Sequence, residues 1–376
     1  MGGRGGGVAL QRAVSRRLVR LKGSQHRYAT TQATGDGAYR NEAAVRGMVS
    51  EQVPMDICDL STIHHPLGAL DYQLPSQPAD FERYKLSPTQ LEHYWQHGFV
   101  ANIPVLSEAD CDRLCEELAA FQQPDLHPGH GLFHEFHRNQ SGDPNNVLMH
   151  CLGHWRIQKV VEHHVNQTGF CSISRFSLPS SSLPPSLSLS LSLNGFHDLI
   201  FHPAITVPSA QLIAGEGRSP TSVRFWHDQL FCKPAAHGGN VAYHQDYSYW
   251  TRTTPMQHLT VHVALDDQSP ENGAITYIPD MDSIKTVLEP DELARFEPVT
   301  LRLRRGEAVI HHPLSVHGSF GNRSPRPRRA AVVNFLADGT LSDSDDPLLG
   351  NTPPVARGQP VRGQFFPVVL DATHLS

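Results

Sequence analysis

The sequence lacks several features that would assign it to a common protein class. No apolar run among its 376 residues is long enough to span a membrane. The six cysteines include no CxxC pair and no regular framework, which indicates reduced thiols in an intracellular compartment. Basic residues are not clustered outside the N-terminus and the formal net charge is -6, so no nucleic-acid partner is expected. The length suits one large barrel-type domain or two ordinary ones, with a small molecule as the expected partner.

Acidic residues are missing from the first 35 positions. The first is Asp36, and the basic residues that precede it are Arg4, Arg12, Arg16, Arg17, Arg20, Lys22 and Arg27. This composition is typical of a transit peptide, and residues 8–22 can form a basic amphipathic helix. We therefore predict a mitochondrial transit segment over residues 1–35; the alternative is a basic tail on a cytoplasmic protein. A peroxisomal address is disfavoured, because the chain ends His-Leu-Ser and not in a Ser-Lys-Leu type signal.

Regular structure follows a turn-rich linker and N-terminal arm over residues 36–80. Residues 87–90, Ser-Pro-Thr-Gln, have the form of a capping box with proline at the first helical position, and Gly98 ends that helix. A strand is predicted over residues 99–103, and a second helix over residues 107–121. The domain therefore begins helix, strand, helix.

Two stretches interrupt the regular pattern. Residues 127–146 are rich in Gly, Pro, Asn and His and are predicted to be a loop. Residues 158–195 form an insert with an uncharged, low-complexity core of Ser, Leu and Pro over residues 177–193. Ser and Leu alternate there with the period of a strand, but the prolines and serines favour an excursion from the domain surface. A translated non-coding segment is a further hypothesis, which comparison with the transcript would test.

Short β-signals dominate the remaining chain. Strands are predicted over residues 223–226, 229–233, 259–265, 274–278, 299–303, 308–312 and 330–336, and a helix over 282–296. Many short strands with Gly and Pro turns and few helices between them argue against a parallel α/β fold. We therefore predict one mainly β domain over residues 81–376, a double-stranded β-helix (jelly roll, cupin-like) with N-terminal and flanking α-helices.

One motif stands out among the 24 histidines. His244-Gln245-Asp246 is the only His-x-Asp or His-x-Glu sequence in the chain. On an extended strand, His244 and Asp246 would point to the same face and could offer an imidazole and a carboxylate to one ion. A distant histidine would complete the set of two histidines and one carboxylate that non-haem Fe(II) oxygenases use, which leaves positions open for a co-substrate and O₂.

The predicted third ligand is His317. His311 and His312 lie nearby, but His317 is followed by Gly-Ser and then by the pair Arg328-Arg329, at the spacing such an oxygenase needs. A planar guanidinium can grip the distal carboxylate of 2-oxoglutarate in a bidentate fashion. Alternation along a strand means that only one of the two arginines points inward.

These residues also carry a family resemblance. Outside the insert, residues 87–370 resemble the phytanoyl-CoA dioxygenase family of Fe(II)/2-oxoglutarate oxygenases. The motifs are WHDQLFCKP at 226–234, HQDYSYW at 244–250, and HGS at 317–319 continuing to Arg-Arg-Ala at 328–330. The resemblance implies that His244, Asp246 and His317 bind iron and are the catalytic residues.

The resemblance also implies how the co-substrate is held. Arg328 would bind 2-oxoglutarate with help from Ser319, and Arg329 is the neighbouring alternative. Lys233 and Trp250 would be candidates for the cavity wall, although an exposed lysine and a packed aromatic are the favoured interpretations of each residue by itself.

The implied activity is hydroxylation of a small organic or acyl substrate, with O₂ consumed, succinate and CO₂ released, and ascorbate supporting turnover. A small residue in place of Asp246 would free a position for halide, so halogenation is disfavoured. The alternative is a non-catalytic metal-binding jelly-roll module, in which the insert and a shortened loop after Pro279 have removed activity. A third reading is a cupin-like metal enzyme that does not use 2-oxoglutarate. Neither the substrate nor the oligomeric state follows from the sequence.

Overall fold

A computed structural model describes residues 61, 64–121, 133–153, 194–277, 298–350, 352–363 and 365–375. The predicted transit segment, almost all of the insert, the helix over 282–296 and the loop after Pro279 lie outside these residues and stay predictions. None of the described helices is both long enough and apolar enough to cross a membrane.

The N-terminal part of the domain follows the predicted helix, strand, helix order. Its elements are α3 (Pro78–Phe81), η2 (Glu82–Tyr84), α4 (Pro88–His97), β1 (Phe99–Pro104) and α5 (Glu108–Phe121). The capping box of α4 is confirmed, because the Ser87 hydroxyl accepts the amide N–H of Gln90 at 3.3 Å and the Gln90 side chain accepts that of Ser87 at 2.9 Å. Gly98 ends the helix in the left-handed conformation at φ 80°.

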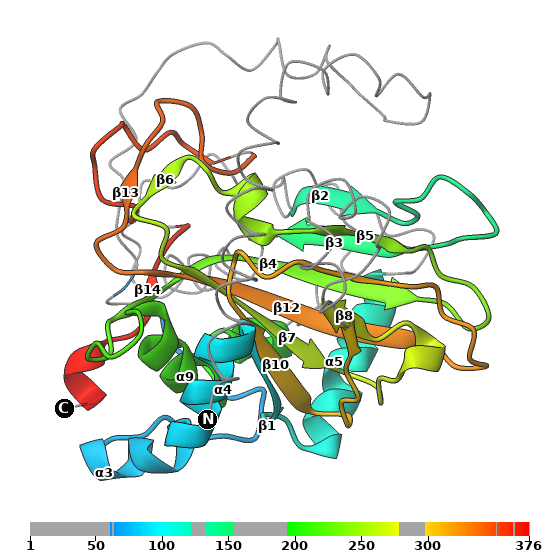
Figure 1. The fold of residues 1–376 in the computed structure, drawn as a ribbon, viewed down its shortest axis with the longest axis horizontal. Helices are drawn as coiled ribbons and strands as arrows, with labels where there is room; N and C mark the ends of the chain where they lie inside the picture. The colour runs from blue at the N-terminus through cyan, green and yellow to red at the C-terminus, as the bar shows by residue number, and fades with distance from the viewer. Residues whose placement is uncertain are drawn as a thin grey trace, which may run out of the picture.

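The larger sheet is antiparallel (Figure 1). Its described strands run in the order β1-β10-β7-β12-β4-β3-β2, and β14 also pairs with β4. They are β10 (Glu307–His311), β7 (His258–Ala264), β12 (Arg328–Ala337), β4 (Val223–Lys233), β3 (Met149–Gly153), β2 (Phe133–His137) and β14 (Val368–Leu370). β4 is one strand where the sequence predicted two, because the polar pair His227-Asp228 stays within the ladder opposite Asn334 and Val333.

A second antiparallel sheet faces the first. Its order is β5 (Val241–His244), β11 (His317–Ser319), β8 (Ile275–Tyr277) and β9 (Val299–Thr300). Apolar residues of both sheets, among them Ile275, Ala264 and Val309, pack in one buried cluster. A small pair, β6 (Thr253–Thr254) with β13 (Leu341–Ser342), forms a separate sheet. The short helices η3 (Asp246–Tyr249), η4 (Pro270–Asn272) and η5 (Ala372–Leu375) complete the described elements. The predicted jelly roll is confirmed.

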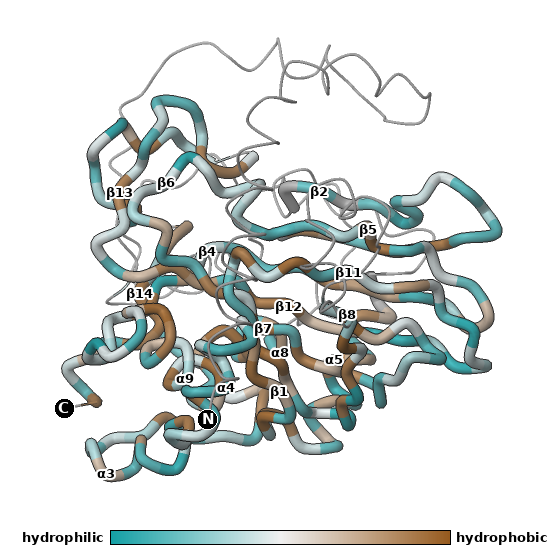
Figure 2. Tube along the Cα trace, in the orientation of Figure 1, coloured by the Kyte–Doolittle hydropathy of each residue, from teal (hydrophilic) through white to brown (hydrophobic). Residues whose placement is uncertain are grey.

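Side-chain alternation gives the larger sheet two different faces. On β12, Val333 and Phe335 belong to the main hydrophobic core, where β12 contacts helix α9 (Pro203–Ile213). Arg328 and Val332, on the opposite face, line a pocket between the sheets. Figure 2 shows hydrophobic residues concentrated where β1, β7, β10 and β12 meet the helices. The polar residues on this second face of the larger sheet therefore form the floor of a site.

Two helices precede β4 without having been predicted. They are α8 (Asn194–Leu199) and α9, whose sequence PAITVPSAQLI contains Pro208. All residues of α9 except Gln211 are buried. A helix that is buried on every side has no amphipathic pattern, so its period cannot be read from the sequence.

Two other predictions are wrong in part. The loop predicted over residues 127–146 contains strand β2, which pairs with β3 at the edge of the larger sheet. The linker predicted over 36–80 ends earlier than expected, since α3 begins at Pro78.

Candidate metal and co-substrate site

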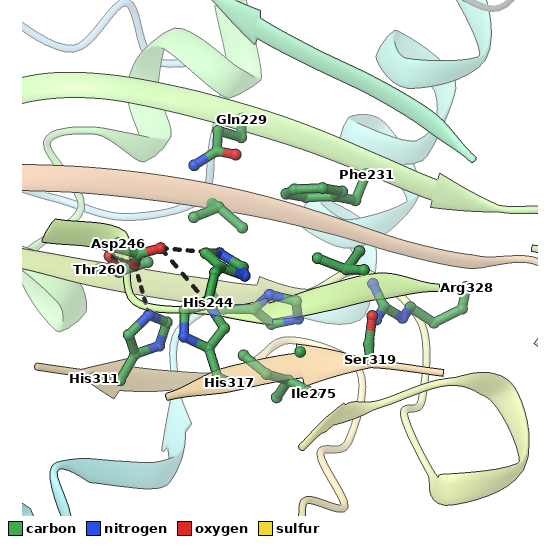
Figure 3. A pocket seen from close by; sticks show the side chains of 14 residues that line it. Gln229, Phe231, His244, Asp246, Thr260, Ile275, His311, His317, Ser319 and Arg328 are labelled. Carbon is green, nitrogen blue, oxygen red and sulfur yellow. Dashed lines mark hydrogen bonds and ion pairs between the residues drawn. The ribbon is translucent and has the colours of Figure 1, made fainter. Parts of the chain in front are cut away.

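The pocket between the two sheets collects most of the polar residues singled out above (Figure 3). The larger sheet contributes Gln229, Thr260, His262, His311 and Arg328, and the smaller contributes His244, His317 and Ser319. Asp246 follows β5, and the apolar part of the wall comes from Phe231, Val241, Ile275 and Val332.

The two predicted histidine ligands are neighbours across a strand pair. His244 on β5 is the register partner of His317 on β11, so their imidazoles lie side by side with ring centroids 4.4 Å apart. Gly318 permits this pairing, because a Cβ there would lie 2.6 Å from a ring carbon of Tyr243. The glycine of the HGS motif therefore allows strands β5 and β11 to lie close together.

Asp246 reaches the histidines from a turn. It is the first residue of η3, so the predicted strand geometry of the His-x-Asp motif is wrong. The turn is fixed by its flanking residues: the Gln245 side chain donates to the carbonyl of Leu314 at 2.6 Å, and the Tyr247 amide donates to that of Pro313 at 3.0 Å. Both bonds attach the turn to the segment that leads into β11.

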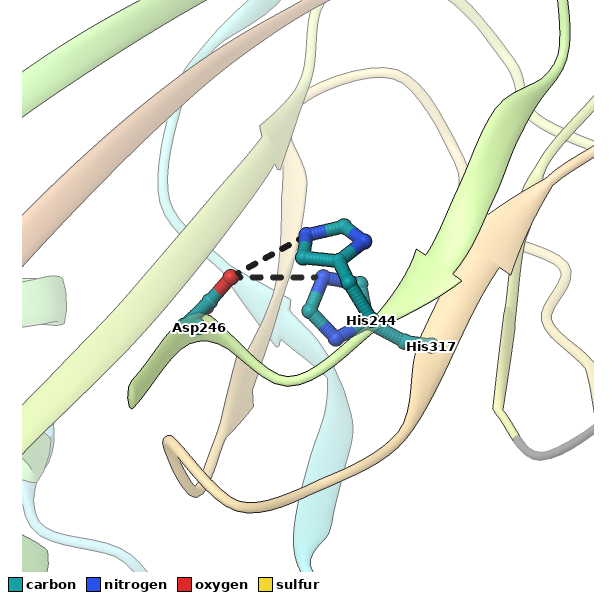
Figure 4. Close-up of side chains that lie close together, drawn as sticks. All are labelled: His244, Asp246 and His317. Atoms are coloured by element: carbon teal, nitrogen blue, oxygen red, sulfur yellow. Dashed lines mark ion pairs between the residues drawn. The ribbon is translucent and has the colours of Figure 1, made fainter. Parts of the chain in front are cut away.

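The three side chains converge on one point (Figure 4). Nε2 of His244 and Nε2 of His317 lie 3.3 and 3.7 Å from Oδ1 of Asp246. One ligand atom from each residue lies within 4.8 Å of the others, and this is the one such group of His, Cys, Asp or Glu among the described residues.

The chemistry of this donor set fits a divalent metal such as Fe(II). Nδ1 of His244 lies 2.8 Å from the carbonyl of Ala242, and Nδ1 of His317 lies 3.1 Å from that of Ser315. Each Nδ1 therefore carries the proton, which leaves an Nε2 lone pair toward the shared centre. Burial holds the pKa of His317 well below its ordinary value, so the ring is neutral.

The Asp246 carboxylate is suited to be the anionic member of the set. Burial alone would raise its pKa, but the imidazoles of His317, His244 and His311 around it hold that pKa well below the ordinary value. The site therefore offers two imidazoles and one carboxylate, as a 2-His-1-carboxylate metal centre requires.

A cationic region adjoins these residues in the same pocket. The Arg328 side chain is 3% exposed, and its guanidinium donates through Nε and Nη2 to the carbonyl of Gly273 at 3.1 and 2.5 Å. Burial lowers its pKa to about 10, so it stays protonated at neutral pH. Arg329 points the other way and pairs with Asp266 at 2.6 and 2.9 Å. Of the two arginines, Arg328 is the one that lines the pocket.

Lys233 lies behind Ser319. Its fully buried Nζ donates to Oγ of Ser319 at 2.8 Å and to the carbonyl of Phe320 at 2.5 Å. Lys233 is the register partner of Arg328 on the neighbouring strand, and no described carboxylate forms an ion pair with either of them. Burial and the adjacent Arg328 lower the pKa of Lys233 to about 6. Two buried basic groups without a carboxylate partner favour binding of an anion beside Ser319.

The stability of the unliganded protein is expected to rise with pH because of Lys233. Between its folded pKa of about 6 and the ordinary lysine value of 10.5, the unfolded chain binds more protons, so raising the pH favours folding. A whole proton of difference is worth about 1.4 kcal/mol per pH unit. Lys233→Met should remove this increment from the unfolding free energy, measured by urea unfolding at several values between pH 7 and 9.

The matched control is Lys85→Met, which removes a lysine that pairs with Glu82 near the surface. This variant should keep the wild-type pH slope. An unchanged slope in Lys233→Met would show that Lys233 is protonated in the folded protein.

Some site residues were missed or misplaced by sequence reasoning. Trp250 is a packed aromatic, as expected, in a separate apolar cluster with Trp226 and Phe366. The expectation of an exposed lysine at Lys233 is wrong, because that side chain is fully buried. Lys233 contacts the pocket through Ser319. Thr260 and His262 were not singled out, although polar residues at alternate positions of an otherwise apolar strand are a usable signal for a face turned to a site.

Comparisons with known proteins identify the family and the fold. Residues 94–330 match the family described as phytanoyl-CoA dioxygenase (PhyH). Among solved structures, the chain is similar to the non-haem α-ketoglutarate-dependent carbocyclase SnoK from nogalamycin biosynthesis, with 18% identity and a TM-score of 0.53 over 79% of this chain and 100% of that one. It is also similar to the epimerase SnoN from the same biosynthesis, with 20% identity and a TM-score of 0.51 over 78% and 100%. These likenesses show a shared fold. No curated protein sequence matches the chain.

Proposed function

Because the chain belongs to the phytanoyl-CoA dioxygenase family, we propose that it is an Fe(II)- and 2-oxoglutarate-dependent oxygenase that hydroxylates a small organic or acyl substrate. The reaction would consume O₂ and 2-oxoglutarate, insert one oxygen atom into a C–H bond, and release succinate and CO₂. The observation that carries the proposal is the convergence of His244, Asp246 and His317 in the pocket that Arg328 lines.

The residues have separate tasks in this proposal. Nε2 of His244, Nε2 of His317 and Oδ1 of Asp246 would hold the iron on one side, which leaves the other side open. When bound, Fe(II) supplies the redox centre at which O₂ and 2-oxoglutarate react. Arg328 would grip the distal carboxylate of 2-oxoglutarate, with the Ser319 hydroxyl as a further hydrogen-bond partner.

The pocket wall favours oxygen transfer to an organic substrate. Val241, Ile275 and Val332 give the pocket an apolar wall, and electrostatic interactions beside apolar groups are stronger than in open water. Asp246 keeps its carboxylate as a ligand, so hydroxylation is favoured over halogenation. Tyr249 is 68% exposed and lies beside His244, with ring centroids 5.8 Å apart, where an entering substrate would meet it.

The proposal is tested by uncoupled turnover of 2-oxoglutarate. Purified protein with Fe(II), ascorbate and 2-oxoglutarate should form succinate, whereas His244→Ala should form none above the protein-free background. Succinate analysis and metal content are measured on the same samples. A wild-type protein that is folded and iron-loaded yet forms no succinate would contradict the oxygenase proposal and favour a non-catalytic metal-binding module. A thermal-shift screen with Fe(II) replaced by an inert metal would then identify substrates by stabilisation.

A further inference from the structure

The two oxygens of the Asp246 carboxylate have different surroundings. Oδ1 faces Nε2 of His244 and Nε2 of His317, as described above. Oδ2 lies 2.9 Å from Nε2 of His311 and 2.5 Å from Oγ1 of Thr260 (Figure 3). Asp246, Thr260 and His311 are all buried, and hydrogen bonds to a charged acceptor are strong in such surroundings.

The contacts of His311 fix the direction of its hydrogen bonds. Nδ1 of His311 lies 2.9 Å from the hydroxyl of Tyr277, which is 2% exposed and stacked on Phe99 with ring centroids 4.3 Å apart. A carboxylate oxygen can only accept, so Nε2 of His311 must carry a proton. Nδ1 then accepts from the phenol, which gives a directed chain from Tyr277 through His311 to Oδ2 of Asp246.

Thr260 supplies the second donor. Its hydroxyl lies between Oδ2 of Asp246 at 2.5 Å and the Asn334 side chain at 2.8 Å. A hydroxyl donates one proton, and the charged carboxylate is the stronger acceptor of the two. Oδ2 of Asp246 therefore receives two hydrogen bonds, from residues on β10 and β7 of the larger sheet.

We propose that His311, oriented by Tyr277, and Thr260 hold Oδ2 of Asp246 away from the metal, so that Asp246 binds it through Oδ1 alone. This inference rests on the proposed iron site. A carboxylate that bound through both oxygens would occupy a coordination position that the co-substrate and O₂ need. His311 is thus a positioning residue, and its closeness to the metal ligands reflects that role and not ligation.

The test measures Co(II) binding and the Co(II) absorption spectrum, which reports coordination number without turnover. His311→Phe should weaken Co(II) binding by about 10–100-fold, the usual effect of losing a hydrogen bond to a ligand, and should change the spectrum toward higher coordination. Tyr277→Phe removes only the hydroxyl and should weaken binding by about tenfold. His311→Gln, whose amide can donate to Oδ2, should restore wild-type binding and spectrum.

The matched control is Tyr72→Phe, which removes another hydrogen-bonded phenol, one that donates to the carbonyl of Asp198. It should leave Co(II) binding unchanged. Wild-type affinity and spectrum in both His311→Phe and Tyr277→Phe would overturn the inference, as would a wild-type protein that binds no Co(II). A protein that binds Co(II) as expected but forms no succinate with Fe(II) would contradict the proposed function and leave the inference standing.

Discussion

Replacing His317 with alanine is expected to abolish both metal binding and 2-oxoglutarate turnover. His317 supplies one of three ligand atoms that lie within 4.8 Å of one another, and the two that remain cannot hold an ion as firmly. Changes one step removed from a ligand already cost about 10–100-fold in metal affinity, so loss of a ligand should cost more than about 100-fold. The measurements are Co(II) affinity by competition with a chelator, and succinate formation with Fe(II).

The control for this prediction is His237→Ala, which removes an exposed imidazole whose Nδ1 contacts the carbonyl of Asn145. Its metal affinity and turnover should match those of the wild type. Free imidazole should partly restore metal binding to His317→Ala, because the truncated side chain leaves room for the same donor. Retained affinity in a folded His317→Ala protein would assign the third ligand elsewhere, with His311 as the nearest alternative.

The choice between His311 and His317 shows what sequence spacing can and cannot resolve. Both histidines lie on strands that reach the pocket, and their rings are 4.3 Å apart. Motif context selected His317, and the structure places Nε2 of His317 with the ligand group. The role of His311 depends on Tyr277, which comes from β8 in the other sheet, and no local pattern reports a contact between strands of different sheets.

The fold was more predictable than the site because strands have a short period and turn residues mark their ends. The β7, β8, β10 and β12 strands were all foreseen within a few residues. Helix α9 was missed, because it is buried on every side and its sequence therefore shows no amphipathic period. The turn at Asp246 was missed for another reason: it is held by carbonyls of Pro313 and Leu314, which are distant in sequence.

The arginine pair shows what side-chain alternation along a strand can predict and what it cannot. Strand geometry required that one of Arg328 and Arg329 face inward, but the sequence alone does not set the phase. The phase follows from the register of β12 against its neighbours, which buries Arg328 in the pocket and turns Arg329 toward Asp266. This difference makes the two arginines a matched pair for experiment.

Replacing Arg328 with glutamine is expected to raise the KM for 2-oxoglutarate strongly while leaving metal affinity unchanged. Truncating one partner of a buried, hydrogen-bonded charge pair costs about 2–5 kcal/mol, or roughly 30-fold to several thousand-fold in affinity. Arg328→Lys keeps the charge but loses the bidentate fork, so its KM should lie between those of the wild type and the glutamine variant. Succinate formation at increasing 2-oxoglutarate concentration gives the KM values, and Co(II) binding gives the metal affinity.

Arg329→Gln is the matched control, because it removes the same group one residue away. Its guanidinium pairs with Asp266, and neither residue lines the pocket, so the change should leave the KM for 2-oxoglutarate unaltered. The opposite ranking, with Arg329→Gln impaired and Arg328→Gln normal, would contradict the assignment of Arg328. If neither variant changed the KM, the co-substrate carboxylate would have to be held by Lys233, the remaining buried basic group in contact with Ser319, and Lys233→Met would then carry the effect.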